Sequence, residues 1–214
     1  MGQARRSGLI GGQEGRSAGS RVSSFAHDLP ARLSGLIPTL LNMSSTPVPA
    51  PISTPVQACC ATPLGPVRLL ASAQGLAGLW FEDQKHRPEA LDTEWPSQPQ
   101  HPLLVRAQTQ LAQYFAGQRP HFDLPLDLGP CTALQQRVWQ ALLEIAPGDT
   151  CSYGELARRI GQPRAVRAVA GAVGRNRLSI FVPCHRVLGS DGSLTGYAGG
   201  LARKRALLEL EGHF

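Results

Sequence analysis

The chain has 214 residues, 42% of them hydrophobic, which is enough for one or two modest domains with hydrophobic cores. No uncharged apolar run approaches the roughly 20 residues of a membrane-spanning helix, so we expect a soluble protein without such a helix. The net charge of +6 divides into +3 for residues 1–42, −2 for residues 43–130 and +5 for residues 131–214. This distribution is compatible with a C-terminal part that binds nucleic acid and equally with an ordinary surface of mixed charge.

The N-terminal stretch has the composition of an unfolded extension. Residues 1–42 are rich in Gly, Ser and Arg without a sustained period of 2 or 3.6, so we expect residues 1–50 to lie outside the folded domains as a disordered extension. An Arg- and Ser-rich, acid-poor start is also typical of an organelle transit peptide. A reading frame extended too far, with Met43 as the true start, is a third explanation. We favour disorder or a wrong start over targeting.

Residues 51–130 are predicted to form a small N-terminal α/β domain. A β-meander is expected from about residue 57 to residue 83, with strands over 67–72 and 76–81. The two strands are joined through Ala73-Gln74-Gly75, and a three-residue loop that ends in Gly suits a hairpin.

A helix and a connection complete this domain. A polar, Pro-bearing loop is expected over residues 84–100. Apolar residues then recur at helical spacing up to about Gly117, at Leu103, Ala107, Leu111 and Tyr114. The Pro-containing connection over residues 118–130 is the predicted domain boundary, so residues 131–214 form the second domain.

The C-terminal domain is predicted to be helical and to contain a helix-turn-helix. Thr132 and Gln135 have the spacing of a capping box and precede an apolar helix face, and Ser152 and Glu155 repeat that spacing ahead of a short helix to Ile160. The turn Gly161-Gln162-Pro163 follows.

Pro163 suits the first position of the second helix of this pair, which is predicted to run to about Val173. Small residues fill that helix, and Arg164 and Arg167 project between them. A slender helix with arginines can approach a DNA duplex closely, even in the minor groove, or it can pack tightly on a neighbouring helix.

Cys184 is the candidate nucleophile, in the run Val-Pro-Cys-His-Arg-Val of residues 182–187. Pro183 allows a helix to begin just before it, and a helix N-terminus or a cationic neighbour lowers the pKa of a thiol. His185 is the candidate base, with a bridging water if the two side chains do not face each other. The five cysteines of the chain form neither an even disulfide framework nor a paired CxxC zinc pattern, so we expect reduced thiols in a cytosol. Apart from Cys184 these thiols are expected to be inert, at Cys59, Cys60, Cys131 and Cys151.

Several short motifs in order resemble those of the O6-alkylguanine-DNA alkyltransferases. The resemblance is strong from Thr132 to the C-terminus, weak from residue 62 to residue 83, and absent from residues 1–50. The matching segments are Ser152-Tyr153, Ala165-Val166-Arg167-Ala168-Val169, Gly174-Arg175-Asn176, Pro183-Cys184-His185-Arg186-Val187, Gly196-Tyr197-Ala198-Gly199-Gly200-Leu201, and Leu207-Leu208 before Glu211-Gly212. It implies an α+β fold, with a ribonuclease-H-like N-terminal α/β domain and a helical, winged helix-turn-helix-like catalytic domain.

The resemblance also implies a reaction. In the family a cysteine takes the alkyl group of O6-alkylguanine, and here of O4-alkylthymine as well, in one irreversible displacement without a cofactor. A histidine activates that cysteine through a water, a glutamate orients the histidine, and a tyrosine and a backbone amide stabilise the leaving guanine. The implied catalytic residues are Cys184, His185, Glu211, Tyr153 and Asn176. The implied pocket residues are Ala198 (amide), Val187 (carbonyl, to the guanine amino group), Tyr197 and Val173.

The implied partner is double-stranded DNA, which is bound through its minor groove with the alkylated base flipped out of the duplex. The resemblance also implies a monomeric, cytoplasmic, bacterial-like protein. Arg167 would fill the space that the flipped base leaves. The implied DNA-binding residues are Arg167, Arg164, Ala168, Ser152 and Arg175.

Two departures from the family pattern have consequences. Ser72 stands where zinc-binding relatives have a cysteine, so no metal is expected. Arg177 stands where relatives often have proline, so a looser turn is expected after Asn176.

Two other functions compete with a transferase. An alkyltransferase-like protein that binds the lesion without repairing it would lack the cysteine that is present at position 184. A Cys-His-Glu hydrolase would need an oxyanion hole and an acyl groove, whereas the arginine-bearing helix-turn-helix favours DNA.

Overall fold

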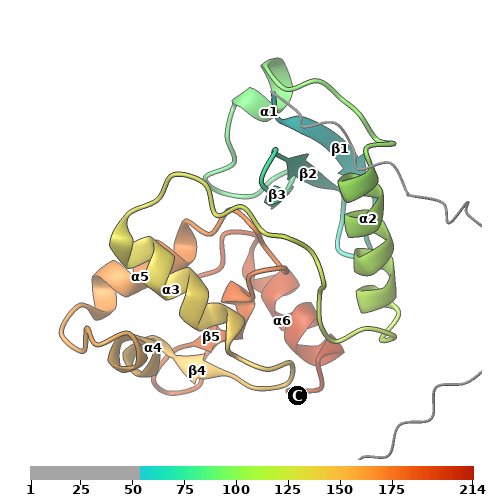
Figure 1. The fold of residues 1–214 in the computed structure, drawn as a ribbon. Coiled ribbons are helices and arrows are strands. Elements are labelled where there is room, and N and C mark those ends of the chain that lie inside the picture. Colours follow the sequence, from blue (N-terminus) through green and yellow to red (C-terminus); the bar gives the residue numbers. More distant parts are fainter. Residues whose placement is uncertain (1–53) are drawn as a thin grey trace, which may run out of the picture. The chain divides into compact units, whose positions relative to one another are not determined.

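The computed structural model describes residues 54–214, and the predictions for residues 1–50, including the alternative start at Met43, lie outside this part. The described chain combines a three-stranded sheet, a two-stranded pair and helices, which is the predicted α+β class (Figure 1). Within residues 54–214, no helix has both the length and the apolar character needed to cross a membrane.

An antiparallel sheet comes first. Its strands are β1 (Val56–Cys60), β2 (Val67–Ala71) and β3 (Leu76–Phe81), and they lie side by side in sequence order. The predicted β-meander is therefore confirmed. The backbone N–H of Ser72 donates to the carbonyl of Gly75 at 2.9 Å, which closes the turn between β2 and β3.

Helix α2 (Pro102–Phe115) packs against this sheet (Figure 1). Proline at its first position lacks only an N–H that a helix start leaves unbonded. The buried stripe includes Ala107, Leu111 and Tyr114 as predicted, but Leu104 is fully buried where Leu103 was expected.

The loop over residues 84–100 contains a one-turn helix that the sequence analysis did not predict, α1 (Ala90–Thr93). Its Leu91 is fully buried against Leu70 and Trp80 on the other face of the sheet. Burial of this leucine, together with hydrogen bonds from Gln57 Nε2 to the carbonyls of Leu91 and Trp95 at 2.7 Å, holds the short segment against the sheet.

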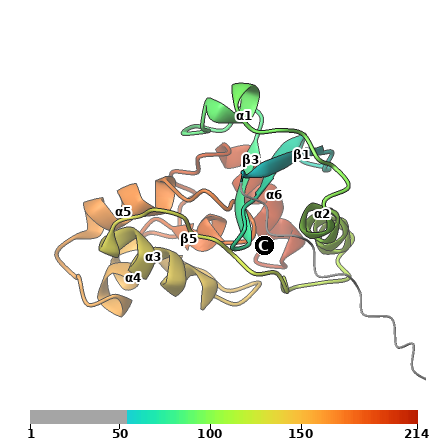
Figure 2. The ribbon, with the colours of Figure 1, turned by 45° about the horizontal axis from the view of Figure 1, so that its top comes forward.

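Helices dominate the rest of the chain (Figures 1 and 2). Both predicted capping boxes are present, because the side chains of Thr132 and Ser152 accept from Gln135 N–H and Glu155 N–H, and the N3 side chains return the bond. A short parallel pairing of Cys151 with Val187 connects the entry to the helix-turn-helix with the segment after Cys184. The elements in order are α3 (Ala133–Leu143), β4 (Cys151–Ser152), α4 (Tyr153–Arg159), α5 (Val166–Gly174), the 3-10 helix η1 (Cys184–Arg186), β5 (Val187–Leu188) and α6 (Leu201–Leu210).

The helix-turn-helix differs from the prediction at its turn. Pro163 does not open α5, because the backbone N–H of Ala165 donates to the carbonyl of Gln162 at 2.9 Å and closes a turn with Pro163 inside it. The fixed φ of proline suits the second position of such a turn as well as a helix start. Helix α5 therefore begins at Val166, and Arg164 lies in the connection, whereas Arg167 lies in the first turn of the helix.

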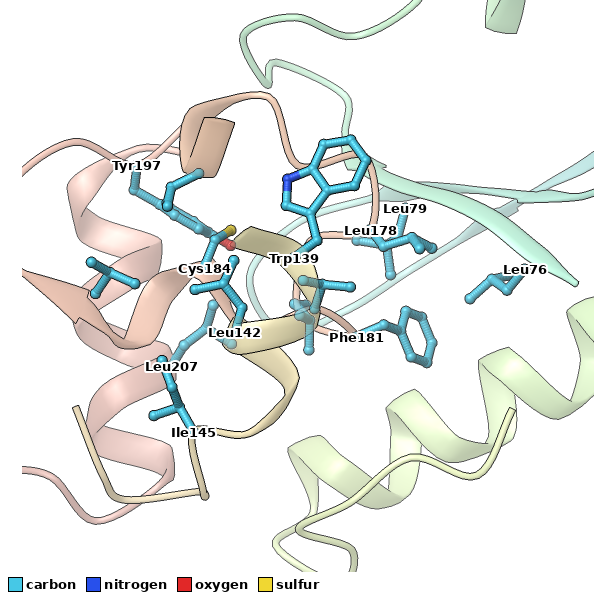
Figure 3. Close-up of a cluster of buried hydrophobic side chains, with 14 of the residues drawn as sticks. Leu76, Leu79, Trp139, Leu142, Ile145, Leu178, Phe181, Cys184, Tyr197 and Leu207 are labelled. Atoms are coloured by element: carbon cyan, nitrogen blue, oxygen red, sulfur yellow. The ribbon is translucent and has the colours of Figure 1, made fainter. Parts of the chain in front are cut away.

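Strand β3 holds the segment that leads to Cys184. The N–H of Leu79 donates to the carbonyl of Arg177 at 2.8 Å, and the N–H of Ser179 donates to the carbonyl of Leu79 at 3.2 Å. Leu79 and Leu178 lie together in the core (Figure 3). The turn after Asn176 is therefore bonded to the sheet, and the looser turn expected from Arg177 is not observed.

Candidate active site and DNA-binding surface

Cys184 is the first residue of η1, and only 4% of it is exposed. Its Sγ accepts a hydrogen bond from Asn176 Nδ2 at 3.0 Å. Burial raises the pKa of the Cys184 thiol, while the Asn176 hydrogen bond and the positive charge of Lys204 oppose the rise. The lowered pKa expected from a helix start and a neighbouring histidine is therefore wrong, because desolvation is the larger effect. The resting thiol is neutral and needs a base.

Asn176 joins the end of α5 to the turn that carries the thiol. Its Nδ2 also donates to the carbonyl of Val182 at 2.8 Å, and its Oδ1 accepts from the N–H of Leu178 at 2.9 Å. Between these contacts Ile180 has a φ of +73°, which is strained for a β-branched residue. A side chain with both a donor and an acceptor is needed to hold this turn.

His185 is fully buried and faces a carboxylate. Its Nε2 lies 3.0 Å from Glu211 Oε1, and both side chains are almost inaccessible, at 0% and 3% exposure. No hydrogen bond joins the Cys184 and His185 side chains, and Nδ1 of His185 has no partner among residues 54–214. Burial lowers the pKa of His185, and Glu211 partly offsets this. A neutral imidazole with its proton on Nε2 leaves Nδ1 as an acceptor.

Glu211 follows the last residue of α6 and receives several donors. Arg186 donates through Nε to Oε2 at 2.8 Å and through Nη2 to Oε1 at 2.7 Å, and the Tyr114 hydroxyl donates to Oε1 at 2.7 Å. The hydrogen bonds from His185 and Arg186 hold the pKa of Glu211 well below its usual range, although burial acts in the opposite direction. The carboxylate is therefore ionised and fixed in orientation beside His185.

A pocket of about 260 Å³ lies between α5, the start of α4 and the loop at residues 196–198. Tyr153 begins α4 in its wall, and its hydroxyl donates to the carbonyl of Gly196 at 3.2 Å. Within the described residues, the N–H of Ala198 makes no hydrogen bond. An unused amide in the wall of a pocket is a donor available to a bound molecule. The lining residues are Lys85, His86, Tyr153, Ala170, Gly174, Gly196, Tyr197 and Ala198.

Two of the predicted pocket residues lie elsewhere or have another partner. Val173 is in the hydrophobic core, because positions 169, 172 and 173 form the inner face of α5, while Ala170 and Gly174 face the pocket. The carbonyl of Val187 accepts from Lys204 Nζ at 2.5 Å, and it retains a second lone pair. Tyr197 lines the pocket and lies beside Cys184 (Figure 3), and burial raises the pKa of its phenol.

The loop at residues 196–200 is held by the segment that follows β3 and by Arg203 of α6. The N–H of Lys85 donates to the carbonyl of Ala198 at 3.1 Å, and Arg203 Nη1 bonds to both the Gly199 carbonyl at 2.9 Å and Asp83 at 2.7 Å. A Cβ on Gly199 would lie 2.8 Å from the ring of Tyr197, so this close approach requires glycine.

The helix-turn-helix presents a basic face. From α4 to the end of α5 five arginines are exposed, whereas Glu155 is the single acidic residue. Arg167 and Ala168 are exposed on the first turn of α5, and Trp139 of α3 donates from Nε1 to the Ala172 carbonyl at 2.9 Å behind it. Such a face is an electrostatic footprint for a polyanion. The five arginines are Arg158, Arg159, Arg164, Arg167 and Arg175.

The other two predicted DNA-binding residues, Ser152 and Arg175, make hydrogen bonds within the protein. Ser152 uses its hydroxyl in the capping box of α4. Arg175 reaches back to the carbonyl of Gly171 at 3.5 Å.

No cluster of three potential metal-binding side chains occurs in the part of the chain that is described. At the position of the family's zinc-binding cysteine, Ser72 donates to Asp127 Oδ2 at 2.5 Å. The residues there form a hydroxyl–carboxylate contact.

Sequence reasoning did not assign roles to several residues of the site. Arg186 was noted only as part of the motif around Cys184, and its two bonds to Glu211 were not foreseen. The sequence feature that could have identified Lys204 is its position as a charged residue on the same helix face as Leu207 and Leu208. Tyr114 was expected only as part of an apolar helix face, and no local pattern marks Tyr114, Lys85 or His86 as site residues, because all three lie far from Cys184 in sequence.

Comparisons with known proteins agree over the described chain. Residues 133–213 match the family described as 6-O-methylguanine DNA methyltransferase, DNA binding domain, and residues 56–128 match the ribonuclease-like domain of the same protein. The methylated-DNA–protein-cysteine methyltransferase of Mycobacterium tuberculosis is 49% identical over 150 residues, covering 70% of this chain and 88% of the relative. That of Haemophilus influenzae is 43% identical over 151 residues, covering 70% and 82%.

Solved structures give the same result. The crystal structure of M. tuberculosis OGT in complex with DNA has a TM-score of 0.66 and 47% identity, and the match covers 74% of this chain and 92% of the other. The crystal structure of M. tuberculosis O6-methylguanine methyltransferase has a TM-score of 0.67 at 46% identity, and the match covers 74% of this chain and 93% of the other.

Proposed function

The chain belongs to the 6-O-methylguanine DNA methyltransferase family, and from this premise we propose how its own residues carry out the reaction. It is a DNA-binding protein that repairs DNA by direct reversal, moving the alkyl group of O6-alkylguanine irreversibly to Cys184. The thioether that forms has no good leaving group, so each molecule reacts once.

Proton removal from Cys184 is the first step. Because the thiol is buried and neutral, its proton passes through a bridging water to Nδ1 of His185, whose Nε2–H is held by Glu211. The imidazolium is stabilised by the ionised Glu211 carboxylate. The hydrogen bond from Asn176 then stabilises the thiolate.

Alkyl transfer follows in one displacement. Sγ forms a bond to the alkyl carbon while the bond from that carbon to guanine O6 breaks, and the electron pair stays on the purine. In this proposal the free N–H of Ala198 stabilises the charge that develops there, and the Tyr153 hydroxyl does the same once it turns from the Gly196 carbonyl to the base. The second lone pair of the Val187 carbonyl accepts from the guanine amino group, and Tyr197 packs against the base.

Access to the alkylated base requires that it leave the duplex. We propose that α5 enters the minor groove, where its small exposed residues permit close approach, and that Arg167 occupies the space vacated by the flipped base. The pocket beside Ala170 and Gly174 of the same helix receives that base. The protein acts as a monomer in the cytoplasm in this proposal.

The observation that carries the proposal is the buried set of Cys184, His185 and Glu211, whose thiol lies near Tyr153 and Tyr197 in the wall of a pocket beside helix α5. Mixing the protein with a duplex containing O6-methylguanine should add one methylene equivalent to the intact mass, mapped by peptide analysis to Cys184. Cys59→Ser removes an exposed thiol and should react normally, whereas Cys184→Ala should not react. Binding without a mass change would indicate a lesion-recognition protein, and multiple turnovers would indicate a hydrolase.

A further inference from the structure

Tyr114 contacts the active site from the sheet-bearing part of the chain. It lies in the last turn of α2, is 3% exposed, and donates its hydroxyl to Glu211 Oε1 at 2.7 Å across 97 residues of sequence. Burial and the Glu211 charge raise the pKa of this phenol far above its ordinary value, so it stays protonated and acts as a donor. The ring packs against Phe115 and Phe122, which fixes the hydroxyl.

The Tyr114 bond completes the coordination of the carboxylate. Oε1 of Glu211 accepts from Tyr114, Arg186 and His185, and Oε2 accepts from Arg186. A carboxylate has about four acceptor sites, and water has little access to a side chain that is 3% exposed. Each donor therefore changes how strongly Glu211 attracts the proton on His185.

The donors to Glu211 weaken the attraction of its carboxylate for the proton on His185. A donor on Oε1 withdraws charge from the carboxylate, so the imidazolium of His185 is stabilised less than it would be by an unbonded oxygen. The other charged or ionisable groups around the pair are Arg186, Lys204, Tyr197 and the Cys184 thiol.

We propose that Tyr114 is a positioning residue of the transfer reaction, through which α2 orients Glu211 and keeps His185 neutral and able to accept the thiol proton at physiological pH. This inference rests on the proposed His185–Glu211 relay. It assigns part of the chemistry to a helix outside the DNA-binding domain. Tyr114 touches neither the thiol nor the pocket, so its effect passes through Glu211.

Tyr114→Phe removes one oxygen and keeps the ring. Single-turnover transfer from a methylated duplex should fall with decreasing pH in both proteins, because His185 must be neutral to accept a proton. Loss of the phenol makes Glu211 a stronger partner for the imidazolium, so the acid midpoint of the variant should lie about one pH unit higher, as expected for loss of a hydrogen bond to a charged group. Duplex affinity should be unchanged.

Gln110→Leu is the matched control. Gln110 lies one turn earlier on the same helix, is buried, and bonds only to the backbone of Asp123. It should lower the melting temperature without moving the acid midpoint. An equal midpoint in Tyr114→Phe and wild type, or an equal shift in Gln110→Leu, would overturn the proposal.

Glu211→Gln provides the second test. If Tyr114 acts through the carboxylate, then Tyr114→Phe should have no further effect on transfer in the Glu211→Gln background, and additive losses would refute the inference. Should Tyr114→Phe fail to fold, folding of the double variant would support the coupling, whereas two unfolded proteins would assign Tyr114 to stability alone. A wild-type protein that transfers nothing would instead refute the proposed function.

Discussion

Replacing Asn176 with alanine tests whether one amide supports both the fold and the nucleophile. The change removes the donor to Cys184 Sγ and leaves the Leu178 N–H buried without its partner, while the Val182 carbonyl loses one of its two donors and keeps the N–H of Cys184 at 2.8 Å. An unpaired buried N–H costs about 1–3 kcal/mol and each lost ordinary hydrogen bond about 1 kcal/mol, so the free energy of unfolding should fall by roughly 2–4 kcal/mol. For a domain of this size that corresponds to a drop of roughly 5–15 °C in melting temperature.

The same variant should also react more slowly. The Asn176 hydrogen bond opposes the rise in the thiol pKa caused by burial, so its loss raises the pKa of Cys184 further. Single-turnover rates at neutral pH should fall roughly ten- to a hundredfold, and the rate should keep rising to higher pH than in wild type. Gln110→Leu should lose stability without this change in pH dependence. A variant that is destabilised but has the wild-type pH profile would show that Asn176 serves only the turn.

Four further predictions use the same assays. Arg167→Ala should slow repair of duplex DNA far more than reaction with free O6-benzylguanine, and equal losses would assign Arg167 to the fold or to general charge. Cys184→Ala should bind duplex with near-wild-type affinity that weakens as salt rises, and transfer from it would disprove the nucleophile. Glu211 has a pKa in the folded protein below its unfolded value, so its contribution to stability is present above about pH 4.3 and is lost as the pH falls below it. Glu211→Gln should therefore transfer the alkyl group slowly, and its stability should depend less on pH in acid. A wild-type rate at every pH would exclude Glu211 from the relay. Removal of residues 1–42 should leave the melting temperature and the repair rate unchanged, because the family matches begin at residue 56, and a large loss in either would show that the extension packs on the folded part.

Local patterns predicted the secondary structure well. The two capping boxes and the β-meander depend on residues a few positions apart, and each occurs in the structure. Pro163 was misplaced because proline suits both a turn and a helix start, and the bond between Ala165 and Gln162 decided between them. Helix α1 was missed because it depends on the burial of Leu91 against a distant strand.

The site could be only partly predicted. The motif around Cys184 and the resemblance to a family indicated Cys184, His185 and Glu211, which the structure brings together. The sequence predicted a lowered pKa for the Cys184 thiol, which is wrong because burial, a property of the tertiary structure, raises it. A raised thiol pKa also means that little thiolate exists without the relay. Loss of His185 or Glu211 should therefore slow transfer strongly. The Tyr114 contact spans 97 residues and leaves no trace in local spacing.

The bond from Trp139 to helix α5 gives the molecule an internal optical probe. The indole is buried, and its N–H is bonded to the Ala172 carbonyl on the inner side of the basic helix. Indole emission depends on such a bond and on the polarity around the ring. A displacement of α5 when DNA binds or when Cys184 is alkylated would change the fluorescence of this tryptophan. Stopped-flow emission from the unlabelled protein, with Trp139→Phe as the blank, would then time the movement of the helix separately from the transfer of the alkyl group.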